Sequence, residues 1–232
     1  MTKENVLFVI IGLLGGMIIG FVFANSVNQR AIAPVAGQAM PGGPLPAGHP
    51  NVPGGGGNGA MGPEVQAAID QAKSDPNNFD AQLKAAEFYY QIQRFDGAIE
   101  FLRRANELKP DSREVIVHLA NAYFDSGKYE ESEKWYVAAL AKKADDVNVR
   151  TDLGLTFIFR EKPNYDRAIQ EFQKSLEVDP NHPQTLQNLT VAYTKKGDAA
   201  NANQTLAKLE GLDPTNDSIT KLREDIKKIG AE

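Results

Sequence analysis

The feature that most constrains this chain is a pattern of residues that returns about every 34 positions between residues 79 and 216. Tyr89 and Tyr123 are 34 residues apart, Tyr123 and Phe157 are again 34 apart, and Tyr193 follows 36 residues later. Small residues return on the same schedule, as Ala98, Ser132, Ala168 and Ala202. Such a period is typical of a repeat array, in which each unit packs only against its neighbours.

Each repeat is predicted to form two short helices. In repeat two, Ile116, Leu119, Ala120 and Tyr123 recur three and four positions apart, as one face of a helix requires. Gly127 then interrupts the pattern and marks the turn between the two helices. Proline cannot continue a helical backbone, so prolines near the repeat boundaries end the second helices. These prolines are Pro76, Pro110, Pro180 and Pro214.

The pattern predicts an all-α domain over residues 63–232. Its four helix pairs are predicted at 79–112, 113–146, 147–182 and 183–216. Pro63 opens one extra helix before them, and a capping helix at 217–229, charged on its outer side, closes the array. Repeat three holds two extra residues around Pro163, which should lengthen its inner turn without changing the stacking. Small residues such as Ala120 and Gly154 indicate where two helices cross closely, because a larger side chain there would force the helices apart.

The N-terminal part of the chain has a different composition. After a short tail at 1–5, residues 6–24 form an apolar run without a charge, long enough as a helix to cross a bilayer. This run is predicted to be a transmembrane signal anchor, because it exceeds the apolar core of most signal peptides. The alternative is a signal peptide cleaved after Ala24. Residues 25–62, rich in Pro and Gly, are predicted to be a disordered linker.

The predicted anchor has a stripe of small residues. Gly12, Gly16 and Gly20 are four positions apart and share one face, where small side chains allow close helix contact. They predict self-association into a homodimer, although Gly is also simply common in such helices. Charges flanking the run favour a cytoplasmic N-terminus only weakly, and residues 31–63 carry no charge that would resist translocation. We therefore expect a single-pass membrane protein with its repeats outside the cytoplasm, on the periplasmic side.

The sequence offers little for catalysis, metals or nucleic acid. The chain has no Cys and only three His, at 49, 118 and 182, without the spacing of a metal motif. The repeat domain holds 23 of the 25 Lys and Arg and 29 of the 30 Asp and Glu. This acidic balance would repel phosphates. We expect no enzyme activity, no cofactor, no metal and no nucleic-acid partner.

These residues resemble the tetratricopeptide repeat family, whose unit of about 34 residues carries Trp, Leu-Gly, Tyr, Ala, Phe and Pro at fixed positions. Leu153 and Gly154 keep the Leu-Gly pair, and Leu119 and Ala120 keep it loosely. The Trp position holds other residues in all four repeats, namely Gln82, Ile116, Arg150 and Leu186. The resemblance implies a tetratricopeptide-type helical solenoid.

The resemblance also implies a peptide-binding groove, because in this family the first helix of each pair lines the concave side. By position the groove residues would be Leu83, Glu87, Tyr90, Gln91, Val117, Asn121, Phe124, Asp125, Thr151, Leu155, Ile158, Phe159, Gln187, Val191, Thr194 and Lys195. An exposed apolar stripe with an acidic and amide rim is expected through Tyr90, Phe124, Leu155, Ile158 and Phe159. The alternative is that some of these residues pack against neighbouring repeats or the N-terminal helix.

Some family members hold a partner's C-terminal carboxylate in a clamp of Lys, Asn and Arg. Here Leu83, Glu87 and Asp152 stand where the cations would be, so such a clamp is not expected. Taken together, the features predict a membrane-anchored adaptor or scaffold that binds a protein or peptide during assembly of envelope complexes. One alternative is a biogenesis factor presenting unfolded chains, as in cytochrome c maturation. Another is a soluble binding protein secreted after signal cleavage.

Overall fold

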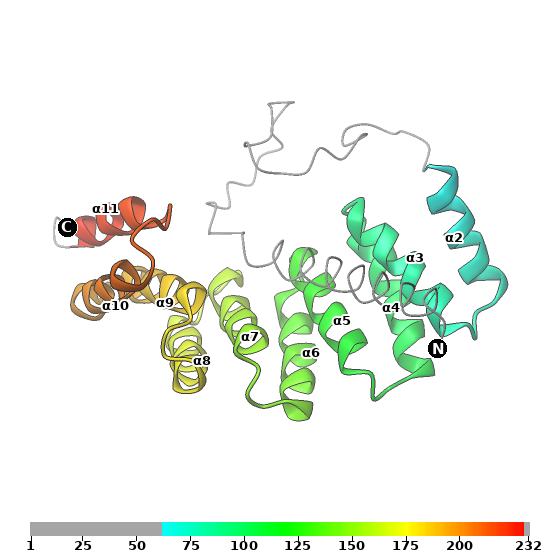
Figure 1. Ribbon diagram of the computed structural model, residues 1–232, viewed down its shortest axis with the longest axis horizontal. Helices are drawn as coiled ribbons and strands as arrows, with labels where there is room; N and C mark the ends of the chain where they lie inside the picture. The colour runs from blue at the N-terminus through cyan, green and yellow to red at the C-terminus, as the bar shows by residue number, and fades with distance from the viewer. Residues whose placement is uncertain (1–61, 230–232) are drawn as a thin grey trace, which may run out of the picture. The chain divides into compact units, whose positions relative to one another are not determined.

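The computed structural model describes residues 62–229, and in that part of the chain every regular element is an α-helix. Ten helices follow one another in a curved row (Figure 1). They are α2 (Pro63–Ser74), α3 (Phe79–Gln91), α4 (Phe95–Leu108), α5 (Arg113–Asp125), α6 (Tyr129–Lys142), α7 (Val147–Phe159), α8 (Tyr165–Val178), α9 (Pro183–Lys196), α10 (Ala199–Leu212) and α11 (Ile219–Ile229). For this stretch, the prediction of an all-α repeat solenoid is confirmed.

The predicted anchor at 6–24, with its glycine stripe, and nearly all of the predicted linker at 25–62 lie outside the described residues. The anchor, its orientation and its self-association therefore stay predictions. Among the helices of residues 62–229, none is both long enough and apolar enough to cross a bilayer.

The helices pack in the order of the chain. The most extensive contacts lie within the pairs α3–α4, α5–α6, α7–α8 and α9–α10, and the next most extensive join each pair to the following one. Each pair thus meets only its neighbours, which is the arrangement of a solenoid. The first helix of each pair lies toward the inner side of the curved row, and the second lies on the outer side (Figure 1).

Each first helix begins at a residue whose side chain accepts a hydrogen bond from the backbone N–H three positions later. These capping residues are Asn78, Ser112, Asp146 and His182. Such a cap satisfies one of the N–H groups that the first turn of a helix leaves unpaired. The caps recur with the repeat, so local chemistry fixes where every first helix starts.

The turn inside a pair is closed by a recurring backbone hydrogen bond. In repeat two the N–H of Lys128 donates to the carbonyl oxygen of Tyr123 at 2.9 Å. In repeat three the two extra residues shift the donor to Asn164, which donates to the equivalent oxygen of Phe157 at 2.8 Å. The insertion lengthens the turn while α7 and α8 still pack as the other pairs do.

Three of these turns contain a residue in the left-handed backbone region, and in two of them that residue is glycine. Gly127 has φ 76° and Gly197 has φ 82°, a conformation that glycine adopts without steric cost. Repeat one places Gln93 at the same position with φ 59°, so there a side chain tolerates the conformation.

Close helix crossings explain the recurring small residues. A Cβ atom on Gly154 would lie 2.4 Å from a ring carbon of Phe172, whose side chain is fully buried. Ala120 is likewise fully buried at the corresponding crossing in repeat two. The predicted reason for these small residues is therefore confirmed.

The apolar core runs along the array as three adjoining clusters. Trp135 packs against both the central and the N-terminal cluster, and Tyr193 packs against both the central and the C-terminal one. The end helices complete the core, since α2 buries Ile69 and α11 buries Leu222 and Ile226. A solenoid needs such end helices because its terminal repeats would otherwise expose apolar surface.

Candidate functional site

The candidate site is the side of the first helices that faces away from the second helices, which we call the inner face. Its partly or fully exposed members are Leu83, Lys84, Glu87, Tyr90, Gln91, Glu114, Val117, His118, Phe124, Asp125, Asp152, Phe159, Val191, Thr194 and Lys195. They come from α3, α5, α7 and α9, so the face extends across all four repeats.

The remaining predicted groove residues are buried. They are Asn121, Thr151, Leu155, Ile158 and Gln187. The structure thus brings the predicted set together on four neighbouring helices, but only part of it is accessible. Whether the accessible part binds a partner stays a prediction.

Thr151 lies inside the contact between repeats three and four. Its Oγ1 is 2.6 Å from Oγ1 of Thr185 and 3.0 Å from Oγ of Ser175, and it donates to the carbonyl oxygen of Val147 at 2.8 Å. With 1% of its surface exposed, this side chain joins α7, α8 and α9 and does not line an open groove. Position within the repeat could not reveal this, because the partner hydroxyl groups come from other helices.

The same hydroxyl cluster includes His182, whose role the sequence did not indicate. Nδ1 of His182 accepts the backbone N–H of Thr185 at 3.3 Å and lies 2.7 Å from the Thr185 hydroxyl. Accepting the N–H requires an unprotonated Nδ1, so the cap needs a neutral ring. Burial lowers the pKa of His182, while Asp179 acts in the opposite direction.

Asn121 is also used within the fold. The hydroxyl group of Tyr136 donates to Oδ1 of Asn121 at 2.8 Å, and both side chains are buried. Burial is the main reason why the pKa of Tyr136 lies well above its usual range. The Asn121 carbonyl oxygen therefore binds a phenol of α6, which repeat counting alone could not show.

The expected exposed apolar stripe is largely a packing contact, and this part of the prediction is corrected. Leu155 and Ile158 are only 6% and 8% exposed and belong to the central core cluster. Phe124 of repeat two meets Phe159 of repeat three edge-on at 5.7 Å between ring centroids, and Tyr129 stacks on Phe159 at 5.9 Å. Rings from adjacent repeats cover one another, which leaves them half-buried.

Carboxylate groups are the most distinctive remaining feature of the inner face. Burial and the nearby Glu114 raise the pKa of Glu87, with Lys84 opposing them. Burial, followed by the charges of Asp125 and Asp146, raises the pKa of Asp152 to about 8. Like charges and burial both disfavour an ionised carboxylate. The acidic groups of α3, α5 and α7 therefore influence one another across the repeat boundaries.

Two more inner-face side chains belong to this acidic region. The Tyr90 hydroxyl donates a hydrogen bond to Asp125, linking repeat one to repeat two. Burial lowers the pKa of His118, and Glu114 opposes that effect. His118 and Asp152 occupy the same position in successive repeats.

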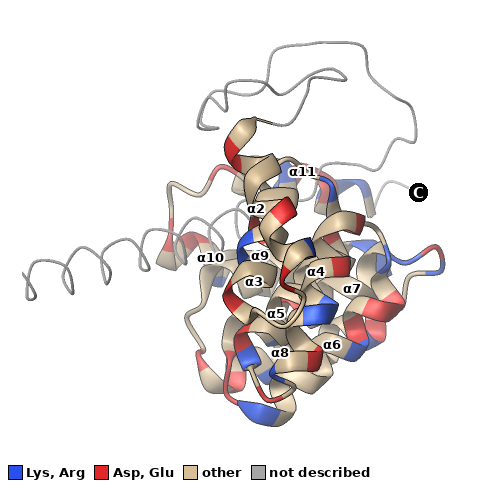
Figure 2. Cartoon of the chain, turned by 90° about the vertical axis from the view of Figure 1, so that its right-hand side faces the viewer, with Lys and Arg blue, Asp and Glu red and all other residues tan. Residues whose placement is uncertain are grey.

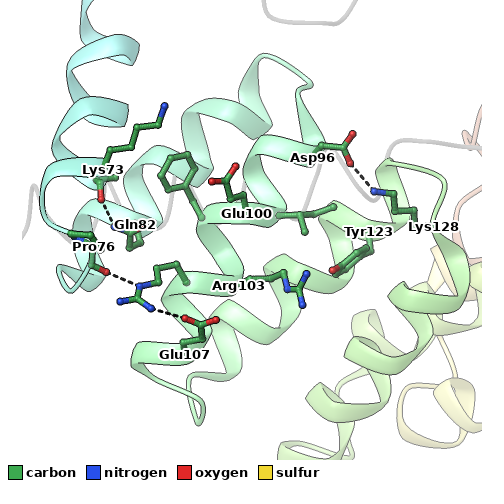
Figure 3. A pocket seen from close by; sticks show the side chains of 13 residues that line it. Lys73, Pro76, Gln82, Asp96, Glu100, Arg103, Glu107, Tyr123 and Lys128 are labelled. Carbon is green, nitrogen blue, oxygen red and sulfur yellow. Dashed lines mark hydrogen bonds and ion pairs between the residues drawn. The ribbon is translucent and has the colours of Figure 1, made fainter.

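A hollow of about 610 Å³ lies elsewhere, beside α2 and α4 (Figure 3). Its charged groups largely pair with each other: Lys128 contacts Asp96 at 2.7 Å, and Arg104 contacts Glu107 at 2.7 Å. Arg104 also donates to the carbonyl oxygen of Pro76 at 3.0 Å. These side chains hold α2 and the turns in place, and they form no converging set of free groups. Nowhere in residues 62–229 do three His, Asp or Glu side chains gather as metal ligands.

The capped first helices, the close crossings and the sequential packing define this domain as a helical-repeat solenoid. The sequence model of the tetratricopeptide repeat matches residues 64–115, 93–151 and 160–226. These matches cover more than half of the chain, and the chain belongs to the tetratricopeptide repeat family.

Known proteins with the same architecture include MamA. A crystal structure of MamA aligns with a TM-score of 0.59 and 25% identity, over 65% of this chain and 86% of that one. The mouse interferon-induced protein with tetratricopeptide repeats 2 is 29% identical over 147 residues, 54% of this chain and 31% of its own. Photosystem I assembly protein Ycf3 of Prochlorococcus marinus is 29% identical over 80 residues, 34% of this chain and 46% of its own. The chain spans less than half the length of these curated relatives.

Proposed function

We propose that this chain is a membrane-anchored scaffold that binds a protein segment along its inner face and holds it during assembly of an envelope complex. The family is one of protein-interaction modules, and a binding role needs a continuous surface with groups to recognise a ligand. The observation that carries the proposal is the inner face itself. Half-exposed aromatic side chains and carboxylates lie there together across three consecutive repeats.

The assembly part of the proposal draws on a relative. Ycf3 is by its name an assembly protein, and it matches this chain over 46% of its own length. A solenoid suits such a role because its extended surface can contact a long segment without enclosing it. The stacking of the helix pairs creates this extended surface. The side chains of the first helices determine which ligand it recognises.

The membrane part of the proposal rests on the apolar run at 6–24. A linker of the length of residues 25–62 would span on the order of 35 Å if it behaved as a random coil. Tethering would keep the repeats close to the membrane and raise their effective concentration for membrane-associated partners.

Site-specific photo-crosslinking in cells tests the binding face. A benzophenone amino acid replaces Lys84 on the inner face, and in the matched control it replaces Lys134 on α6; both lysines are exposed. We expect discrete crosslinked protein products from position 84 and none of these products from position 134. Equal labelling at both positions, or none at position 84, would contradict the proposed face.

Protease treatment of intact spheroplasts tests the location. An epitope placed after Glu232 reports on the repeats, and lysed cells show whether the protease can cut them. Digestion of the epitope in intact spheroplasts supports an extracytoplasmic domain. Protection that is lost on lysis would place the repeats in the cytoplasm and overturn the location.

A further inference from the structure

We propose that the inner face of repeats one to three binds a cationic protein segment, in which lysine or arginine residues alternate with apolar ones. This inference rests on the proposed function and names the chemistry of the partner. It is carried by the distribution of charge over the first helices.

Acidic groups dominate the first helices of repeats one to three. The inner-face carboxylates are Glu87, Glu114, Asp125 and Asp152. Two cations of these helices are already engaged, since Arg113 forms an ion pair with Asp146 and Arg150 contacts Glu171 at 3.0 Å. Lys84 is the one cation that remains on this part of the inner face, so the face has an excess of negative charge.

Three of the four inner-face carboxylates have no ion-pair partner within the described part of the chain. Glu87, Glu114 and Asp152 form no ion pair with any residue between 62 and 229. By contrast, Lys142 of the outer helix α6 pairs with Asp111 in the connection before α5, and charges of both signs are interspersed on the outer helices (Figure 2). The inner face of repeats one to three thus concentrates carboxylates around a single lysine, whereas the outer helices mix charges of both signs.

Asp152 is the inner-face carboxylate that the surrounding protein shields most strongly from water. Its side chain is half-buried overall, but the surrounding protein is close enough to its carboxyl group for burial to be the main cause of the raised pKa. The side chain has no hydrogen bond or ion pair to a residue of 62–229 and is partly exposed, so a ligand can reach its carboxyl group. With a pKa of about 8 the Asp152 carboxyl group is largely protonated at pH 7, and a lysine or arginine of a bound segment would favour its ionised form and form a charge-assisted hydrogen bond with it.

Aromatic rings beside the carboxylates suit the same ligand. Tyr90 lies next to Phe95, at 5.3 Å between centroids, and its hydroxyl contacts Asp125. Phe124 is half-buried in the following repeat. The methylene stem of a lysine or arginine can lie along such rings while its charged end reaches a carboxylate. Apolar residues of the segment would cover the remaining ring surface.

Repeat four limits where the cationic segment can lie. Repeat four carries neutral residues at the positions of Glu87, Glu114 and Asp152. At the position of Asp125 it carries Lys195, which is exposed without an ion pair to a described residue. Positive charge at this end would repel a cationic segment. We therefore place the segment on α3, α5 and α7, with its least charged end toward α9.

Peptide binding to the full-length protein in nonionic detergent tests this inference. The probes are three labelled peptides of equal length. The first is built from Lys, Leu and Ala, and the other two have Gln or Glu in place of every Lys. Fluorescence anisotropy gives the Kd at about 50 mM and about 300 mM salt, across which screening of exposed charges increases strongly. We expect the Lys peptide to bind at least about tenfold more tightly than the Gln peptide at low salt, and to lose affinity at high salt.

A variant and a matched control locate the binding. The inner-face variant is Glu87→Gln, Glu114→Gln and Asp152→Asn. The control, Glu100→Gln, Glu131→Gln and Glu177→Gln, removes the same charge from exposed positions of the second helices. We expect the first to weaken Lys-peptide binding by at least about tenfold and the control by less than about twofold.

Each outcome decides between the two proposals. Binding of the Gln or Glu peptide as tight as that of the Lys peptide, or equal losses in both variants, would overturn the cationic class but leave the binding face intact. No peptide binding together with no crosslink from position 84 would overturn both. The comparison of peptides on the unaltered protein keeps the test valid if the triple variant unfolds.

Discussion

Replacing Gly154 by alanine tests whether α7 and α8 cross as closely as the structure shows. The added Cβ would lie 2.4, 2.7 and 2.9 Å from three ring carbons of Phe172. Carbon atoms in favourable contact are about 3.5–4.0 Å apart. The ring is fully buried and cannot turn into solvent, so the ring or the helix must move.

The expected magnitude is the difference of two effects. Inserting a methyl group into a well-packed core costs about 1–3 kcal/mol, and a 2.4 Å approach places this site toward the upper part of that range. Alanine in place of glycine in a helix contributes about 1 kcal/mol of stability. The net expectation for Gly154→Ala is a loss of about 1–2 kcal/mol in the free energy of unfolding.

Gly211→Ala is the matched control. Gly211 is exposed in α10, and a Cβ there would meet no atom within 4 Å. The same chemical change should therefore stabilise the protein by up to about 1 kcal/mol. The two substitutions are expected to have opposite signs although both place alanine in a helix.

Urea unfolding of the full-length chain in nonionic detergent, followed by circular dichroism, measures both variants. Repeat arrays can unfold in parts, so the slopes of the transitions are compared together with their midpoints. A midpoint for Gly154→Ala at or above that of the unaltered protein, with Gly211→Ala stabilised, would refute the close-crossing argument.

Three further predictions concern buried polar groups. Because burial lowers the pKa of His182, its neutral form stabilises the fold above the unfolded pKa of about 6.5, and this contribution is lost as the pH falls. Urea midpoints between about pH 5 and 7.5 should therefore fall more steeply for the unaltered protein than for His182→Asn, and equal slopes would contradict the cap assignment. Because the folded pKa of Asp152 is about 8, its ionisation costs stability progressively from about pH 4 upward and fully above pH 8. Asp152→Asn should then raise the midpoint at pH 9 but not at pH 4, and a uniform shift would argue against a buried carboxylate. Arg150→Met removes one charge-assisted hydrogen bond from Glu171, which is 3% exposed and keeps contacts to Lys174 at 3.0 Å and Arg167 at 3.8 Å, so it should cost about 1.5–3 kcal/mol. Adding Glu171→Met should recover much of that loss, and no recovery in the double variant would refute a buried ion pair.

The array was predictable from the sequence because its signals are local. The caps at Ser112 and Asp146, the turn at Gly127 and the spacing of apolar residues all act within one repeat. The pattern recurs in four repeats, so an ambiguous helix boundary in one repeat can be assigned by alignment with the others. Even the insertion near Pro163 was placed correctly in a turn, since its neighbours keep the helical pattern.

The binding face was only partly predictable because exposure depends on other repeats. Position within the repeat placed Thr151 and Leu155 on a first helix, but hydroxyl groups of α8 and α9 and the surrounding core bury them. The raised pKa of Asp152 likewise depends on Asp125, which lies one repeat away. The spacing of residues along one helix shows which side chains share a face, but it does not show which residues of other helices pack against them.

The sequence by itself determined the helices, their pairing and the solenoid, because hydrogen bonding, capping and apolar spacing act over a few residues. Only the tertiary structure decided which side chains of the first helices remain accessible and which of their carboxylates form ion pairs with other residues of 62–229. Those properties arise when residues about 34 positions apart come within a few ångströms of each other. Stacking thus turned the apolar stripe expected from Leu155 and Ile158 into core, and it left a carboxylate-rich face in its place.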